Sequence, residues 1–213
     1  MKSTTVYIIR HGQTEGNKDN KYIGSVDIGL TELGILQAEV TAKHLYGSVK
    51  FDAIYSSDLK RAYITAQKTA ELQGLEVKTD AGFRELFGGE WENKTFTEII
   101  AGYPDDYKVW KTDYSRVRPT GGESVEEMHE RVYTALKKVA KENEGKTIAI
   151  FAHGGVVRSL VCRLSGRKLS QINEIPWASN TSITIAKIGD KDELISAQNN
   201  DHLGGEMVTN FKD

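Results

Sequence analysis

KTIAIFA, at residues 146–152, is the stretch that decides the fold, because it is short, mostly apolar and free of glycine and proline, as a buried strand is. An amphipathic pattern typical of a long helix precedes it at 124–142, and a helix candidate follows it from Val156 to Leu164. A strand with a helix before and after it is the building unit of α/β domains. The stretch therefore predicts a sheet of mainly parallel strands.

The same alternation runs along the rest of the chain. Further strands are expected at 4–10, 51–55, 76–78, 182–187 and 193–198, and further helices at 31–47 and 58–74. Asp58 is a suitable N-cap for the second of these helices, and Gly47 is available to end the first. We expect an α/β fold of three layers, in which helices flank a mainly parallel sheet.

One segment breaks the alternation. Residues 82–122 are rich in glycine, aromatic and charged residues and have no clear strand periodicity. We predict that they form a small cap insertion of loops and short helices over one end of the sheet. Because no repeat or linker-like segment is present, residues 1–213 are expected to form a single domain that carries this cap.

Composition argues against several classes of protein. The chain has 28 basic and 30 acidic residues and a net charge of −2, whereas non-specific nucleic-acid binding needs a strong positive field. No apolar stretch approaches the length of a secretory or transmembrane segment, so we expect a cytoplasmic protein without a membrane partner. Cys162, the only cysteine, lies in an apolar stretch and is expected to be buried. The oligomeric state is left open.

Polar residues follow three of the predicted strands at the point where each strand ends. One strand ends in Arg10-His11-Gly12, a second leads into a helix that carries Arg61, and a third ends in His153-Gly154-Gly155. Ligands of open α/β sheets bind at the carboxyl ends of the strands, and arginines and helix N-termini there suit an anion. Each group alone is also typical of a solvated or turn residue. Their recurrence at three strand ends favours a phosphate site.

These residues belong to a set of motifs that resembles the histidine phosphatase superfamily, which includes the cofactor-dependent phosphoglycerate mutases. The motifs stand in the family's order and extend from about Val6 to Ile185. They are Arg10 to Asn17, Leu30 to Gly34 with Gln37-Ala38, Ser56 to Ala62 with Thr65-Ala66, Arg84-Glu85-Leu86, Gly121 to Ser124, and His153-Gly154-Gly155 with Arg158.

The resemblance implies phosphoryl transfer without a cofactor. His11 would attack phosphorus and form a phosphohistidine, with its other ring nitrogen held by a backbone carbonyl. Glu85 would act first as general acid and then as general base. The residues implied to bind the phosphoryl oxygens or the substrate, a small phosphate ester, are Arg10, Arg61, His153, Asn17, Gly24 and Gly154.

The acid and the absence of a metal can also be weighed from the residues. Glu90 and Glu92 lie close to Glu85 and are rival candidates, although the Arg-Glu pair after the third strand favours Glu85. A metal mechanism needs grouped carboxylates and histidines. Because His11 and His153 accompany arginines, which repel a cation, we predict no metal.

The segment after the acid motif bears on the reaction. The mutases that this chain resembles carry a longer insertion with an adjacent arginine pair, to which Arg116 and Arg118 come nearest here. Glu90-Trp91-Glu92 is similar to the phosphatase branch. We predict a metal-independent phosphomonoester hydrolase acting on a small phosphorylated metabolite. The alternatives are a cofactor-dependent phosphoglycerate mutase and a non-catalytic module that binds phospho-ligands.

Two departures from the phosphatase branch concern the pocket floor. Gly88 stands where that branch commonly has an aromatic residue, and Asn93 stands where it has glycine. Three aromatic residues of the insertion, Trp91, Trp110 and Tyr103, are expected in its core, and Trp91 is also a candidate for lining the substrate entrance. Five basic residues either contact a second anionic group or are simply solvated: Lys94, Lys108, Lys111, Arg116 and Arg118.

Overall fold

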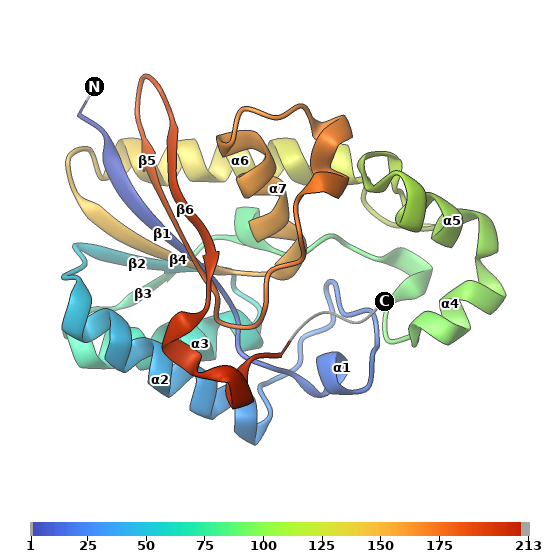
Figure 1. The fold of residues 1–213 in the computed structure, drawn as a ribbon, viewed down its shortest axis with the longest axis horizontal. Helices are drawn as coiled ribbons and strands as arrows, with labels where there is room; N and C mark the ends of the chain where they lie inside the picture. The colour runs from blue at the N-terminus through green and yellow to red at the C-terminus, as the bar shows by residue number, and fades with distance from the viewer. Residues whose placement is uncertain (1, 210–213) are drawn as a thin grey trace.

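The computed structural model describes residues 2–209 and contains a six-stranded sheet between two layers of helices (Figure 1). The strands are β1 (Thr4–Arg10), β2 (Ala53–Ser56), β3 (Val77–Thr79), β4 (Thr147–Ala152), β5 (Ile183–Ile188) and β6 (Glu193–Asn199). Their order across the sheet is β3-β2-β4-β1-β5-β6. The first four of these are parallel, whereas β5 pairs antiparallel with β1 and β6 pairs antiparallel with β5. The predicted fold, a mainly parallel sheet flanked by helices, is confirmed.

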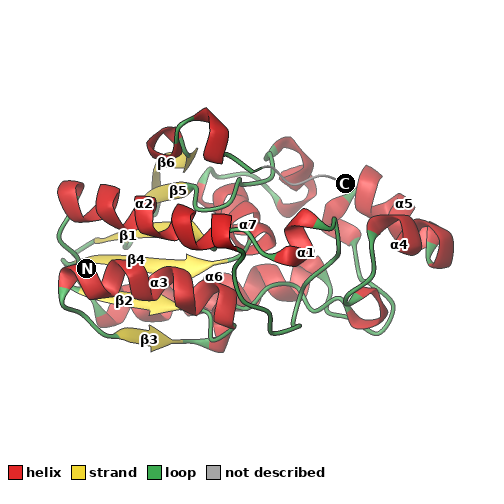
Figure 2. Cartoon of the chain, turned by 90° about the horizontal axis from the view of Figure 1, so that it is seen from below, coloured by secondary structure: helices red, strands yellow, loops and turns green. Residues whose placement is uncertain are grey.

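The long helices form the two outer layers. In Figure 1, α2 (Glu32–Ser48) and α3 (Lys60–Gln73) lie below the sheet, and α6 (Val125–Glu142) and α7 (Gly154–Leu164) lie above it. In Figure 2 the arrow of β4 points towards the end of the molecule that carries the short helices. These are α1 (Glu15–Lys18), α4 (Phe96–Gly102) and α5 (Pro104–Thr112). The short helices thus lie beyond the carboxyl ends of the parallel strands.

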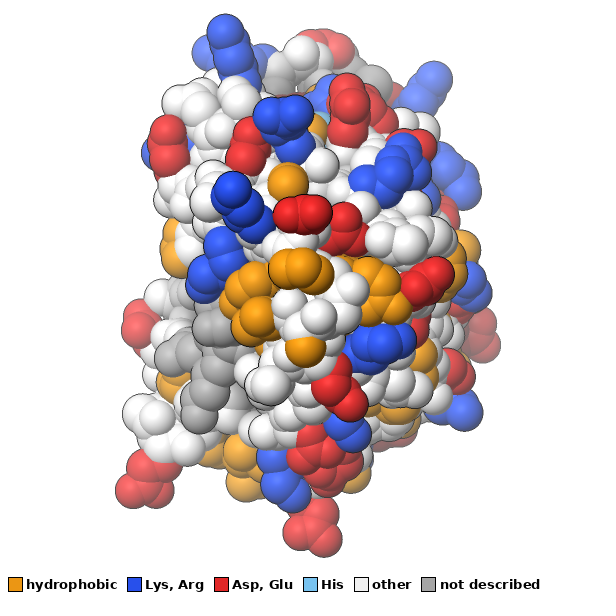
Figure 3. All heavy atoms as spheres, turned by 90° about the vertical axis from the view of Figure 1, so that its right-hand side faces the viewer, with side chains coloured by type: hydrophobic (Ala, Val, Ile, Leu, Met, Phe, Trp, Pro, Cys, Tyr) orange, Lys and Arg blue, Asp and Glu red, His pale blue; other side chains and the backbone are white. Residues whose placement is uncertain are grey.

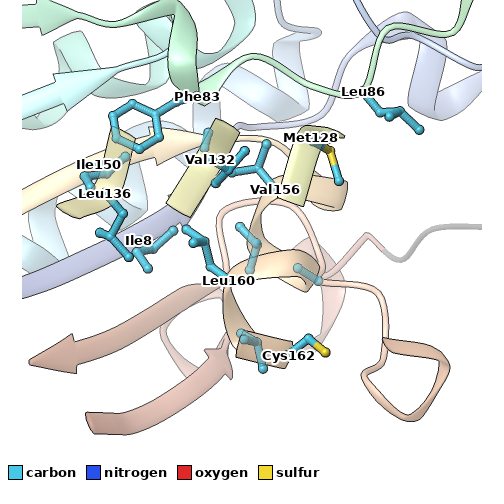
Figure 4. Close-up of a cluster of buried hydrophobic side chains, with 14 of the residues drawn as sticks. Ile8, Phe83, Leu86, Met128, Val132, Leu136, Ile150, Val156, Leu160 and Cys162 are labelled. Carbon is cyan, nitrogen blue, oxygen red and sulfur yellow. The ribbon is translucent and has the colours of Figure 1, made fainter. Parts of the chain in front are cut away.

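Alternation along the central strands divides the core into two clusters. Ile8 of β1 is fully buried against α6 and α7, and its neighbour Ile9 belongs to the cluster on the α2 and α3 side. Figure 4 shows Ile8 and Ile150 beside Val132 of α6 and other apolar side chains of the first cluster. Cys162 belongs to the same cluster and is buried, as predicted.

Three helix boundaries differ from the predicted ones. The helix after β2 begins at Lys60, so Asp58 stands one residue too early to be its N-cap. The Asp58 carboxylate pairs with Arg84 instead, and the Lys60 N–H donates to Asp27 Oδ1 at 2.8 Å. Gly47 lies inside α2, and α7 begins at Gly154 rather than at Val156. The residues expected to mark these boundaries therefore do not mark them, because the helix continues past the residue or a tertiary contact takes its place.

The segment predicted as the cap contains α4, α5 and three short 3₁₀ turns, and its centre is aromatic. Trp110 lies at the middle of this cluster, with ring centroids 5.5 Å from Trp91, 5.8 Å from Phe96 and 4.8 Å from Tyr114. Such pairs add stabilisation of about 0.5–1.5 kcal/mol each beyond the burial of their area. Within residues 2–209, none of the helices is long and apolar enough to cross a membrane.

Candidate active site

His11 follows β1 at the edge where the parallel strands end. Its backbone N–H donates to Ala152 O at 2.9 Å, so the β1–β4 pairing continues up to the histidine itself. The side chain is buried, and Nδ1 lies 2.7 Å from Gly12 O. Because a carbonyl only accepts, Nδ1 carries the hydrogen and Nε2 keeps its lone pair. The backbone contact expected for this histidine is present.

The protonation state of His11 follows from its surroundings. Burial, together with the nearby Arg61 and Arg10, holds the pKa of His11 well below its ordinary value. The ring is therefore neutral at neutral pH. A neutral ring with a free Nε2 is the form that can act as a nucleophile.

Arg10 is anchored at one end and open at the other. Its Nη1 donates to Ala178 O, whereas its buried Nε has no hydrogen-bond partner among the described residues. Burial lowers the pKa of Arg10 to about 10, and Glu85 partly offsets this effect, so the guanidinium stays charged at neutral pH. Gly154, the first residue of α7, lies against the same guanidinium. A charged donor without a partner inside a protein is costly unless a ligand completes it.

Arg61 lies on the first turn of α3 and is almost fully buried. It donates from Nε to His153 Nδ1 at 3.2 Å, from Nη1 to Val26 O at 2.8 Å and from Nη2 to Gly24 O at 2.6 Å. Burial lowers the pKa of Arg61 to about 10, so it too stays charged. Arg61 therefore holds the 23–26 loop and orients the second histidine.

His153, the N-cap residue of α7, lies beside His11 with ring centroids 5.2 Å apart. Because its Nδ1 accepts from Arg61, the neutral ring carries its hydrogen on Nε2. That Nε2 is buried and has no partner among the described residues. Burial and the neighbouring Arg61, His11 and Arg10 hold the pKa of His153 well below its ordinary value. The site thus contains two unpartnered donors, Arg10 Nε and His153 Nε2.

Glu85 lies in the segment after β3, and its carboxylate lines the same pocket as His11 and Arg10. Its Oε2 accepts from the Gly155 N–H and its Oε1 from the Leu86 N–H, both at 2.9 Å. A Cβ on Gly155 would stand 2.5 Å from Glu85 Oε1, so this approach requires glycine at the second position of α7. Arg131 of α6 donates to Gly82 O at 2.9 Å, which holds the chain just before the acid.

The rival carboxylates have structural partners. Glu92 accepts hydrogen bonds from four backbone N–H groups, those of Gly24, Ser25, Val26 and Gly88. Glu90 accepts from the Tyr103 hydroxyl at 2.7 Å. Glu92 therefore ties the 23–26 loop to the acid segment, and of the three carboxylates Glu85 is the one that lines the pocket.

The pocket at this edge of the sheet has two chemically different walls. One wall is polar and comprises Arg10, His11, Asn17, Arg61, Glu85 and Gly154. The other is aromatic and comprises Tyr22, Trp110, Tyr114 and Trp177, with Lys21 beside it. Figure 3 faces the end of the molecule that carries α1, α4 and α5, where hydrophobic side chains group among charges of both signs.

Several sequence expectations for the pocket need correction. Gly24 does not line it, because its N–H and C=O are used by Glu92 and Arg61. Trp91 is fully buried in the core of the insertion, as expected, and does not line the pocket, whereas Trp110 belongs to the same core and also lines the pocket. Of the two alternatives left open for the five basic residues of the insertion, contact with an anion in this pocket is not favoured, because none of the five lines it. Arg118, for example, pairs with Glu127.

Sequence reasoning also missed five lining residues. Lys21, Tyr22 and Ile23 come four to six residues after the opening motif, and that proximity was the signal that could have found them. Tyr114 and Trp177 had no such signal. Trp177 stacks on Trp110 with ring centroids 5.5 Å apart, although the two are far apart in the sequence.

The family model of the histidine phosphatase superfamily (branch 1) matches residues 6–201 of this chain. The chain belongs to this family. It is 36% identical over 192 residues to phosphoglycerate mutase-like protein 4 of Arabidopsis thaliana, covering 88% of this chain and 81% of that protein. It is 32% identical to phosphoserine phosphatase 1 of Hydrogenobacter thermophilus, covering 96% and 97% of the two chains.

A solved structure extends the similarity to the fold. A mutant phosphoserine phosphatase from Entamoeba histolytica, in complex with phosphoserine, superposes with a TM-score of 0.83 at 33% identity. The match covers 94% of this chain and 99% of that one. Membership of the family makes this protein a histidine phosphatase, an enzyme of the phosphomonoesterase class, as the motifs indicated.

Proposed function

We propose that this protein hydrolyses small phosphomonoesters through a phosphohistidine formed on His11 Nε2. The observation that carries the proposal is the pairing of a neutral, carbonyl-held histidine with two unpartnered buried donors, Arg10 Nε and His153 Nε2. A phosphoryl group in transfer spreads its charge over three equatorial oxygens, so donors fixed in advance lower the barrier.

In the first step, His11 Nε2 attacks phosphorus as the bond to the leaving oxygen breaks. Arg10 and His153 bind phosphoryl oxygens, and Asn17 adds its amide NH₂, since its Oδ1 already accepts from the Thr14 N–H. Arg61 acts through its charge and by orienting His153. Glu85, in its protonated form, gives its proton to the leaving oxygen.

In the second step, water replaces the leaving alcohol. Glu85, now a carboxylate, takes a proton from the water while the water oxygen forms a bond to phosphorus. The P–N bond breaks, the pair of electrons returns to His11 Nε2, and inorganic phosphate leaves. Glu85 is again protonated, so the cycle closes without a further reactant.

The substrate class follows from the wall opposite the phosphate. Lys21 lines the pocket, and its salt bridge to Asp19, at 3.5 Å, is solvent-exposed and weak. A substrate with a carboxylate near its phosphate would gain an ion pair there. O-phosphoserine, the substrate named for two of the similar proteins, has this form. We therefore propose a small phosphorylated carboxylic acid as substrate.

A phosphate-release assay in excess EDTA tests this function. The panel comprises O-phosphoserine, 3-phosphoglycerate and simple alkyl phosphates, with wild type compared with His11→Ala. Hydrolysis that resists EDTA and is lost in the variant is expected. Isomerisation of 3-phosphoglycerate outrunning hydrolysis would establish the mutase, and binding without turnover would establish a non-catalytic module.

Three expectations stay predictions. A cytoplasmic location is tested by cell fractionation, and the absence of a nucleic-acid partner is tested by gel shift with duplex and single-stranded DNA. The organisation as one domain with a cap at 82–122 is tested by limited proteolysis, in which a single folded core should survive.

A further inference from the structure

Tyr22 connects the two walls of the pocket. Its ring is buried and makes edge-on contacts with Trp91 at 5.7 Å and Trp110 at 5.8 Å between centroids. Its hydroxyl donates to Leu86 O at 2.8 Å. The N–H of the same Leu86 donates to Glu85 Oε1. Tyr22, itself part of the aromatic wall, is therefore also in contact with the segment that holds the acid.

The space that Tyr22 fills is bounded by Gly88. A Cβ placed on Gly88 would stand 2.3 Å from Cε1 and 2.7 Å from Cδ1 of the Tyr22 ring. The backbone of Gly88, with φ −83° and ψ −3°, is open to any residue. The Tyr22 ring, rather than the backbone conformation, thus excludes a side chain at residue 88.

The buried setting makes this exclusion firm. Tyr22 is surrounded by Trp91, Trp110 and Phe96, so its ring cannot turn away without displacing another aromatic side chain. A side chain at 22 and a side chain at 88 therefore compete for one volume. In this chain residue 22 occupies it.

We propose that Tyr22 determines specificity by forming the floor of the leaving-group side of the pocket, in a volume that a residue-88 side chain could fill instead. Its hydroxyl also acts as a positioning group for Glu85 through the backbone of Leu86, whose C=O accepts from Tyr22 and whose N–H donates to Glu85. The assignment rests on the proposed hydrolase function, in which Glu85 protonates the leaving oxygen. It concerns the size of the leaving group and leaves the phosphate donors unchanged.

Two aryl esters test the floor. Phenyl phosphate and 1-naphthyl phosphate differ mainly in size, since both release a phenol of similar acidity. In Tyr22→Ala, the naphthyl-to-phenyl ratio of kcat/KM should rise roughly tenfold or more. The double variant Tyr22→Ala/Gly88→Phe should return the ratio to within about threefold of wild type, because the volume is filled again from the other side. An unchanged ratio in a folded Tyr22→Ala protein would overturn the assignment.

Tyr22→Phe tests the hydroxyl. It should lower kcat on O-phosphoserine several-fold while the naphthyl-to-phenyl ratio stays at the wild-type value, because the ring remains. Tyr103→Phe removes a hydroxyl from the cap outside the pocket and should change neither quantity. Equal effects of the two variants would show that Tyr22 acts only through general stability of the cap and would overturn the positioning role.

A binding measurement separates this inference from the proposed reaction. Calorimetric affinities for phenylphosphonate and 1-naphthylphosphonate, which cannot be hydrolysed, are compared in wild type and Tyr22→Ala. A shifted affinity ratio without any His11-dependent hydrolysis would refute the proposed function and support Tyr22 as the floor. Intact hydrolysis with both ratios unmoved would refute the Tyr22 assignment and leave the function standing.

Discussion

The polar and aromatic walls of the pocket are built in different ways. The polar wall holds its side chains by hydrogen bonds to backbone carbonyls, as in the contacts of His11 with Gly12 and of Arg61 with Gly24. The aromatic wall depends on ring packing between segments far apart in the sequence, as in Trp110 against Trp177. We therefore expect that reaction and specificity can be altered separately in this protein. Damage to the first wall should lower turnover of every ester, and damage to the second should change which ester is preferred.

Removal of the nucleophile is the strongest way to break the polar wall. His11→Ala should lower kcat by on the order of 10³-fold or more for all esters, because no phosphohistidine forms. Steady-state phosphate release measures the effect. His44→Ala, at an exposed histidine of α2, is the matched control and should retain wild-type activity. Retained turnover in His11→Ala would refute the proposed mechanism.

Loss of the acid should depend on the leaving group. Glu85→Gln should lower kcat on an alkyl phosphate by about 10²–10⁴-fold. The loss on p-nitrophenyl phosphate should be much smaller, because nitrophenolate leaves without a proton. Glu90→Gln, which lies outside the pocket, is the control. Equal losses on both esters would assign Glu85 a role other than proton transfer.

A change in the aromatic wall should leave phosphate binding intact. Trp110→Ala should destabilise the protein by about 3–5 kcal/mol, because it empties a nearly fully buried site. Among the folded molecules, KM for O-phosphoserine should rise several-fold while inhibition by inorganic phosphate stays within about twofold. A parallel rise of both constants would mean that the walls are coupled.

His11 and the neighbouring His153 should also make stability depend on pH. His11 and His153 have lowered pKa values in the folded state, so below about pH 6.5 the unfolded chain binds more protons than the folded one. Stability present above that pH should therefore fall as pH decreases, by about 1 kcal/mol per histidine between pH 6.5 and 5.5. Urea unfolding across this range measures it, and His11→Asn should reduce the slope. A flat profile in wild type would contradict the neutral assignment.

The smallest expected effect concerns Asn93, which follows Glu92, the residue that binds the 23–26 loop. Its φ of +65° is in the left-handed region, where asparagine and glycine are tolerated. Asn93→Gly should change the free energy of unfolding by no more than about 0.5 kcal/mol, whereas Asn93→Ala should cost about 1 kcal/mol. Thermal unfolding distinguishes the two. A large loss in Asn93→Gly would show that the side chain, rather than the backbone, matters.

The departures at Asn93 and Gly88 show where local sequence was sufficient. At Asn93 a positive φ explains how asparagine stands where the phosphatase branch commonly has glycine, because both residue types tolerate this conformation. At Gly88 the sequence showed that a side chain is absent but did not show why. The ring that fills the space belongs to Tyr22, which is distant in the chain. The Asp58 cap failed for a similar reason, since Asp27 from another loop took the helix N–H.

The sheet, its flanking helices and the residues of the polar wall could be predicted from local sequence patterns. Strand periodicity is local, and the carboxyl ends of parallel strands meet at one edge of the sheet. The sequence therefore predicted that His11 and His153 lie close together. The aromatic wall, the hydrogen bonds of Glu92 to the 23–26 loop and the position of Lys21 could be seen only in the tertiary structure. These depend on how the loops and the 82–122 segment pack over the sheet, and such packing is a sum of many weak contacts that no local pattern encodes.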